Sequence, residues 1–137
     1  MANGATEIDV ALNVLAIKSG RLDVAQRELE EIVRMAAGKA KIKAVFEHSV
    51  FTPAEKQAVL TMIRSSGADY VKIQNMLSGH GARVEDVKLA YDILGRNVGI
   101  KIDGGIKTLQ QAETLLAAGA TRLGLTATAK IAEEARK

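Results

Sequence analysis

Hydrophobic and polar residues follow two periodic patterns, and segments with one pattern alternate along the chain with segments that have the other. Alternation at every second residue is typical of a strand, and apolar residues at every third or fourth position are typical of a helix. The first pattern predicts strands over residues 7–13, 41–47, 69–75, 97–103 and 122–127. The second predicts helices that begin near Leu22, Pro53, Val84 and Leu109, with a short last helix near Ala129. Strands that alternate with single helices pair in parallel through right-handed crossovers, so the fold class is α/β.

The start of the second predicted helix is the clearest boundary. Thr52 stands at the N-cap position, Pro53 at the first helical position and Glu55 three residues after the cap. This arrangement predicts a capping box, in which the threonine and glutamate side chains satisfy free backbone amides at the helix start.

The predicted strands are apolar on one face only. In the first strand Ile8, Val10 and Leu12 oppose Glu7, Asp9 and Asn13, and the next three strands keep the same alternation. A doubly wound sheet is covered by helices on both faces, and its strands are apolar on both. The one-sided pattern instead suits the wall of a barrel with a functional interior, or an open sheet with one solvated face.

A repeated motif links three of the strands. The segments GATEIDV (4–10), GADYVKI (67–73) and GATRLGL (119–125) share a helix stop, a turn and a strand entry. Their sixth positions are Asp9, Lys72 and Gly124. Because alternate strands of a parallel barrel contribute the side chains of one interior layer, the motif predicts an acid, a lysine and a gap at one height.

Chain length limits how much of a barrel can form. The 137 residues hold five βα units, and eight such units would need roughly 220 residues, as in a complete eight-fold barrel. With 47% hydrophobic and 26% charged residues, residues 1–137 are expected to form a single globular (βα)5 domain. The expected architecture is a partial TIM barrel, with an open or flavodoxin-like sheet as the alternative.

Composition excludes several classes of site. The chain has no cysteine and only two histidines, His48 and His80, in different predicted loops, so we expect neither a disulfide nor a metal site. The net charge of +3 is scattered and aromatic residues are few, which disfavours a nucleic-acid partner. No apolar run of transmembrane length and no leader are visible, which predicts no membrane partner and a cytoplasmic location.

Lys72 raises a chemical question, because it stands in the middle of a predicted strand. A buried and unpaired ammonium is costly, since desolvation penalises the charged form. The lysine must therefore reach water or take part in chemistry.

Six segments together resemble the deoxyribose-phosphate aldolase family. They are GATEIDV (4–10), KSG (18–20), GADYVK (67–72), GARVEDV (81–87), GIKIDGGIKT (99–108) and GATRLG (119–124). The resemblance aligns the chain with the last five βα units of that family's barrel, and we expect the first three units to be absent. It implies a class I aldolase that cleaves 2-deoxyribose 5-phosphate to glyceraldehyde 3-phosphate and acetaldehyde, through a lysine Schiff base and without metal or other cofactor.

The resemblance also implies roles for individual residues. Lys72 corresponds to the Schiff-base lysine, Lys101 to a second lysine that lowers its pKa, and Asp9 to a proton-relay carboxylate; the alternative for Asp9 is an ion pair with Lys43 or Lys72. A neighbouring cation favours the neutral amine that a nucleophile needs. The remaining candidates are Lys43, as a further interior lysine, and the phosphate-binding residues Gly104, Gly105 and Thr126, although the two glycines alone also suit a simple turn.

The chain departs from the family pattern beside the reactive lysine. After Lys72 the family has Thr-Ser-Thr-Gly-Phe, whereas this chain has Ile-Gln-Asn-Met-Leu at residues 73–77, and Asp103 replaces a small residue. Two functions from different classes therefore stay open. One is an aldolase that acts on a sugar phosphate or aldehyde and completes its pocket as a homo-oligomer through the exposed sheet face or edges. The other is a non-catalytic barrel fragment.

Overall fold

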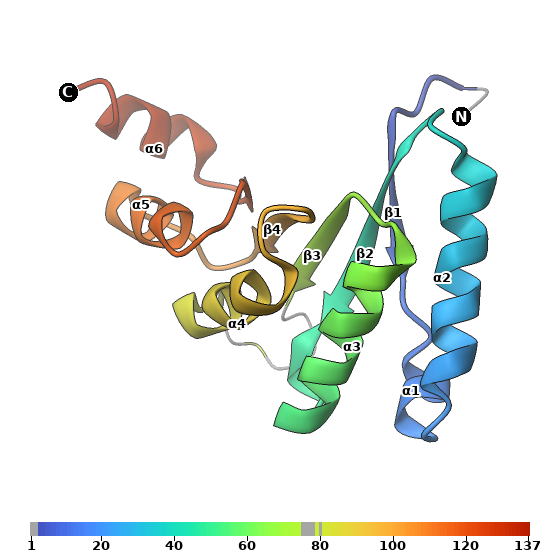
Figure 1. The fold of residues 1–137 in the computed structure, drawn as a ribbon. Coiled ribbons are helices and arrows are strands. Elements are labelled where there is room, and N and C mark those ends of the chain that lie inside the picture. Colours follow the sequence, from blue (N-terminus) through green and yellow to red (C-terminus); the bar gives the residue numbers. More distant parts are fainter. Residues whose placement is uncertain (1–2, 75–78, 80) are drawn as a thin grey trace.

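The computed structural model describes residues 3–74, 79 and 81–137, and in this part of the chain five parallel strands form one sheet (Figure 1). The strands are β1 (Glu7–Ala11), β2 (Lys41–Glu47), β3 (Tyr70–Gln74), β4 (Gly99–Asp103) and β5 (Arg122–Gly124). The helices are α1 (Val14–Lys18), α2 (Leu22–Ala36), the 3-10 turn η1 (His48–Val50), α3 (Pro53–Ser66), α4 (Val84–Leu94), α5 (Leu109–Ala117) and α6 (Thr128–Glu134). All five predicted strands and the five predicted helices are confirmed.

The differences lie at the ends of strands. β1 stops at Ala11 because the Asn13 side chain accepts a hydrogen bond from the Ala16 amide (3.0 Å) and starts α1, a short helix that the hydrophobic pattern did not predict. β5 ends at Gly124, where the pairing with β4 also ends. The predicted capping box of α3 is present, since Glu55 N–H donates to Thr52 Oγ1 (3.3 Å) and Thr52 N–H donates to Glu55 Oε2 (2.8 Å).

Strand order distinguishes the two expected architectures. The strands lie in chain order, β1-β2-β3-β4-β5, whereas a flavodoxin-like sheet has the order 2-1-3-4-5. The chain therefore folds as a partial (βα)5 barrel with an open sheet.

The core lies between the sheet and its helices. Side chains on the apolar strand face, such as Phe46, Val71 and Ile102, are at most 2% exposed. They pack with Leu29 of α2 and Leu60 of α3 in one cluster of buried residues. The opposite strand face carries the charged residues, and we call it the concave face.

The pairing register confirms the predicted layer of Asp9, Lys72 and Gly124. Asp9 pairs with Lys43, and Lys43 pairs with Tyr70, which precedes Lys72 by two residues. Likewise, Lys72 pairs with Lys101, and Lys101 pairs with Arg122, which precedes Gly124 by two residues. This stagger of one residue per strand is that of an eight-stranded barrel with a shear of eight, in which staggered residues share a height.

Candidate active site

An ionic layer near the amino ends of the strands ties the first strand to the last. The Arg122 guanidinium donates to Glu7 Oε1 (2.7 Å) and to the Tyr70 hydroxyl (2.9 Å), and it lies 4.2 Å from the centre of the Tyr70 ring. The bond to Glu7 joins residues 115 positions apart in the chain. The side chains of β1, β3 and β5 thus converge over the concave face.

Lys43 on β2 connects this layer to the next. Its side chain is buried, and its Nζ lies 2.8 Å from Glu7 Oε2 and 3.0 Å from Asp9 Oδ1. Burial lowers the pKa of Lys43, but the hydrogen bonds to Glu7 and Asp9 outweigh it and raise the pKa above its ordinary value. Lys43 is therefore a cation that holds two carboxylates in place.

Lys72 lies at the centre of the concave face, with its side chain 17% exposed. Its Nζ is 3.1 Å from Asp9 Oδ2 and 3.1 Å from Asp103 Oδ2. Burial lowers the pKa of Lys72, but the hydrogen bonds to Asp103 and Asp9 outweigh it and raise the pKa above its usual range. The prediction that Lys72 has a depressed pKa is wrong for this structure, because two carboxylates stabilise its charged form.

Lys101 stands beside Lys72 in the register of β3 and β4, as predicted. Asp103, however, makes contact with both amines, since its Oδ1 lies 3.6 Å from Lys101 Nζ. The carboxylate therefore offsets the repulsion that Lys101 was expected to exert on Lys72. The alternation of this strand already placed Asp103 on the same face as Lys101, but it did not indicate that the carboxylate contacts both lysines.

Asp9 forms both of the ion pairs that the sequence left open, one with Lys43 and one with Lys72. Burial raises the pKa of Asp9, but the hydrogen bonds from Lys43 and Lys72 outweigh this effect, so the net shift of the pKa is downward. Asp9 is thus a carboxylate within reach of the Lys72 amine.

The diglycine after β4 closes a tight loop. Gly104 N–H donates to the Gly124 carbonyl (3.2 Å), and the Gly104 carbonyl accepts from Ala82 N–H (2.8 Å). Both glycines have positive φ angles, 100° and 71°, and a Cβ on Gly105 would lie 2.9 Å from the Cα of Gly81. Turn geometry and close backbone packing thus account for these glycines without a ligand.

Thr126, the third phosphate-binding candidate, is exposed. It lies two residues before the first residue of α6 and two residues after Gly124.

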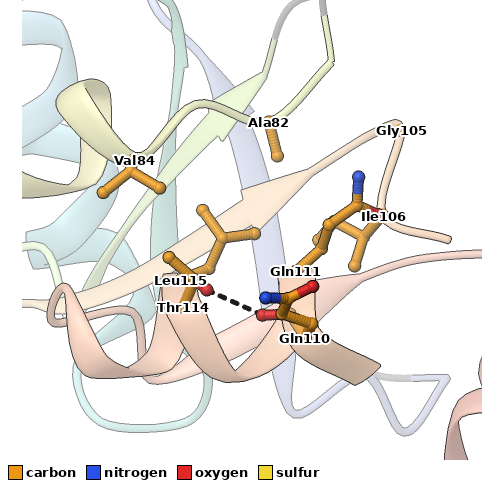
Figure 2. A pocket seen from close by; sticks show the side chains of 8 residues that line it. All are labelled: Ala82, Val84, Gly105, Ile106, Gln110, Gln111, Thr114 and Leu115. Atoms are coloured by element: carbon orange, nitrogen blue, oxygen red, sulfur yellow. Dashed lines mark hydrogen bonds between the residues drawn. The ribbon is translucent and has the colours of Figure 1, made fainter. Parts of the chain in front are cut away.

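A hollow of about 190 Å³ opens behind the diglycine, between the start of α4 and α5 (Figure 2). It is lined by Ala82, Val84, Gly105, Ile106, Gln110, Gln111, Thr114 and Leu115. Two of its polar side chains have partners within the protein, since Thr114 Oγ1 donates to the Gln110 carbonyl (2.7 Å) and Gln111 Oε1 accepts from Lys107 N–H (2.8 Å). Gly105 is the one candidate site residue that lines this hollow, and the lysines of the concave face do not line it.

A second polar cluster, which the sequence did not indicate, is buried where β2 meets α3 and α4. His48 Nδ1 lies 3.0 Å from Asp86 Oδ1 and 3.0 Å from Lys56 Nζ. His48 was expected in a loop, and it lies in the η1 turn with 4% of its surface exposed. His80, Asn75 and Met76 lie outside the described residues.

In residues 3–74, 79 and 81–137 no three or more His, Cys, Asp or Glu side chains gather as a metal site would require. Among the helices of the same part of the chain, none combines the length and apolar character needed to span a membrane.

The chain is similar to deoxyribose-phosphate aldolases over nearly its whole length. It is 39% identical over 125 residues to the enzyme of that name from Halalkalibacterium halodurans, and the alignment covers 91% of this chain but 56% of the relative. No protein-family model matches the chain.

Solved structures give the same result. The chain superposes on the aldolase QR15 with a TM-score of 0.89 and 30% identity, covering 98% of this chain and 61% of the other. It superposes on the deoxyribose phosphate aldolase from Aeropyrum pernix, described as tetrameric, with a TM-score of 0.83 and 25% identity, covering 99% and 57%. The resemblance indicated by the motifs is confirmed, for a chain that spans little more than half the length of these proteins.

Proposed function

We propose that this chain, whose relatives are deoxyribose-phosphate aldolases, carries a Schiff-base lysine of the class I aldolase type at Lys72. The single observation that supports the proposal most is the pair of carboxylates, Asp9 and Asp103, each 3.1 Å from the Lys72 amine. An amine needs a partner to remove its proton before it attacks a carbonyl, and carboxylates at hydrogen-bond distance are such partners.

The reaction would proceed by covalent catalysis. The neutral Lys72 amine attacks the aldehyde carbon of 2-deoxyribose 5-phosphate or a related aldehyde, and the carbonyl oxygen takes up one proton from water through Asp9 and leaves as water to give an iminium ion. The bond between C2 and C3 then breaks as the 3-hydroxyl group gives its proton to water or to Asp9, which releases glyceraldehyde 3-phosphate and leaves an enamine on Lys72. Protonation of the enamine and hydrolysis release acetaldehyde and regenerate Lys72.

The remaining residues support this amine. Asp9 relays protons between Lys72 and water, and Lys43 holds Asp9 in position through its 3.0 Å ion pair. Lys101 supplies a second positive charge next to the reacting amine. Gly104, Gly105 and Thr126 receive the phosphate of a phosphorylated substrate. No metal or other cofactor takes part in the proposed steps.

Because Lys72 rests as an ammonium ion, the proposal predicts a pH dependence. The pKa of Lys72 lies above its ordinary value, so the fraction of neutral amine is small at neutral pH and grows as the pH rises. The initial rate of Schiff-base formation should increase with pH across the range from about 7 to 10.

Borohydride trapping tests the proposed function. The protein is incubated with acetaldehyde, reduced, digested and analysed by mass spectrometry, and the adduct is expected on Lys72. Lys72→Leu should abolish the adduct, while Lys41→Leu should retain it, because Lys41 is an exposed lysine paired with Asp69. Adduct formation that persists in Lys72→Leu would refute the proposal.

A second candidate is a non-catalytic barrel fragment. The observations that favour it are the open sheet, in which β1 and β5 each pair with one other described strand, and the raised pKa of Lys72, which favours the unreactive ammonium form. In this case the concave charges serve folding alone. A protein that unfolds cooperatively but forms no adduct with any small aldehyde would support this candidate.

We further propose a cytoplasmic homo-oligomer made of copies of this single domain, residues 1–137. Within the described chain β1 pairs only with β2, and β5 pairs only with β4. Unpaired strand edges favour association through added strands. Light scattering should then give a mass that is a multiple of 14.6 kDa, and a monomer mass at all concentrations would contradict this assignment.

A further inference from the structure

Asp103 lies between the Lys72 amine and the residues proposed to bind a phosphate. Its Oδ2 lies 3.1 Å from Lys72 Nζ, and the next residue in the chain is Gly104. In the register of the sheet it pairs with Gly124, two residues before Thr126. The Asp103 carboxylate therefore stands between the two segments that are proposed to receive a phosphate.

The fit of this side chain depends on the missing side chain of Gly124. A Cβ built on Gly124 would lie 1.8 Å from Asp103 Oδ1, so the carboxylate fills the gap that the repeat predicted at this position. Oδ1 is buried and has no hydrogen-bond partner among the described residues, although Lys101 Nζ lies 3.6 Å away. Asp103 is thus partly enclosed within the site: its Oδ1 is buried, and 26% of its side chain is exposed.

The positive charges near this place are already neutralised. Lys72 and Lys101 both contact Asp103, Lys72 also contacts Asp9, and Lys43 contacts Asp9 and Glu7. A phosphate that enters here would meet a fixed carboxylate and would have to displace it from its lysines. An aldehyde without charge would meet no such repulsion.

We propose that Asp103 makes the Lys72 site select uncharged aldehydes over phosphorylated ones. The inference rests on the proposed Schiff-base function and adds the class of substrate. Two like charges about 6 Å apart, even at an effective dielectric constant of about 40, disfavour binding about tenfold. The Asp103 carboxylate already provides a negative charge beside Lys72 and Lys101, so these lysines do not need the phosphate of a substrate as a partner.

Glyceraldehyde and glyceraldehyde 3-phosphate form a matched pair of probes, because they share the reactive aldehyde and differ in the phosphate. Each is incubated with the protein and borohydride, and the initial rate of adduct formation on Lys72 is followed by mass spectrometry. Both probes react with the same amine, so the ratio of their rates cancels any change in the fraction of neutral Lys72.

The wild-type protein is expected to form the adduct faster with glyceraldehyde. Asp103→Asn removes the charge and keeps the shape, and it should raise the ratio of phosphorylated to unphosphorylated rates about tenfold. Asp92→Asn is the control, since it removes the same charge from an exposed position on α4 and should leave the ratio unchanged.

The failures of the two proposals can be told apart. An adduct on Lys72 whose rate ratio is the same in wild type and Asp103→Asn overturns the selection by Asp103 and leaves the Schiff-base function standing. A wild-type preference for the phosphorylated probe has the same meaning. No adduct on Lys72 with either aldehyde in any variant refutes the Schiff-base function, and the inference fails with it.

Discussion

The contact between Gly124 and Asp103 predicts a strong energetic coupling between these two positions. A methyl group at position 124 would lie 1.8 Å from Asp103 Oδ1 and 2.5 Å from Asp103 Cγ, whereas ordinary contacts are about 3.5–4.0 Å. The Asp103 side chain would have to rotate away and give up its 3.1 Å ion pair with Lys72. We expect Gly124→Ala to lower the free energy of unfolding by about 1–3 kcal/mol.

The same substitution should have the opposite effect once the carboxylate is gone. The φ angle of Gly124 lies outside the left-handed region, so alanine fits the backbone and should gain about 0.5–1 kcal/mol by restricting the unfolded chain. In an Asp103→Ala background, Gly124→Ala should therefore be neutral or stabilising. The coupling energy from the double-mutant cycle is expected to be about 2 kcal/mol or more.

Urea unfolding followed by circular dichroism measures the four free energies of the cycle. Gly99→Ala is the matched control, because a Cβ on this strand glycine would meet the Tyr70 ring at 2.3 Å and not Asp103. Its cost should be the same with and without Asp103→Ala. If Gly124→Ala costs the same in both backgrounds, Asp103 does not occupy the gap and the described site geometry is wrong.

Three further predictions concern stability. Lys43→Met should cost about 1.5–3 kcal/mol in urea unfolding, because it leaves Glu7 and Asp9 without their buried cation, whereas Lys41→Met, at an exposed pair, should cost less than about 0.5 kcal/mol. The pKa of Glu7 is lowered to about 2 from 4.5, chiefly by the Arg122 hydrogen bond. The stabilisation from ionised Glu7 is therefore present above about pH 4.5 and is lost as the pH falls towards 2. Glu7→Gln should flatten the dependence of the unfolding free energy on pH in this range, and an unchanged dependence would contradict the pairing with Arg122. Thr52→Ala should lower stability by about 1 kcal/mol by removing the N-cap of α3, and a thermal melt that does not shift would show that the cap is dispensable.

The alternation of apolar and polar residues was sufficient to predict the βα order and the single polar face of the sheet. Both follow from local rules, since side chains alternate along a strand whatever lies around it. The repeat at positions 9, 72 and 124 also predicted a shared layer, and the stagger of the strands confirmed it. Motif spacing was enough to indicate the aldolase relatives.

Tertiary structure decided which charges are partners. The sequence placed Lys72 and Lys101 side by side and predicted repulsion, but the distances show Asp103 in contact with both amines. The bond between Arg122 and Glu7 spans 115 residues, and no local pattern indicates such a pair.

The physical reason is that alternation fixes the face on which a side chain lies and leaves its direction and partner open. Partners depend on the curvature of the sheet, on the stagger of its strands and on gaps such as Gly124, which admits the Asp103 carboxylate. The protonation of Lys72 follows from these distances, and for that reason the sequence located the amine but assigned it the wrong direction of pKa shift.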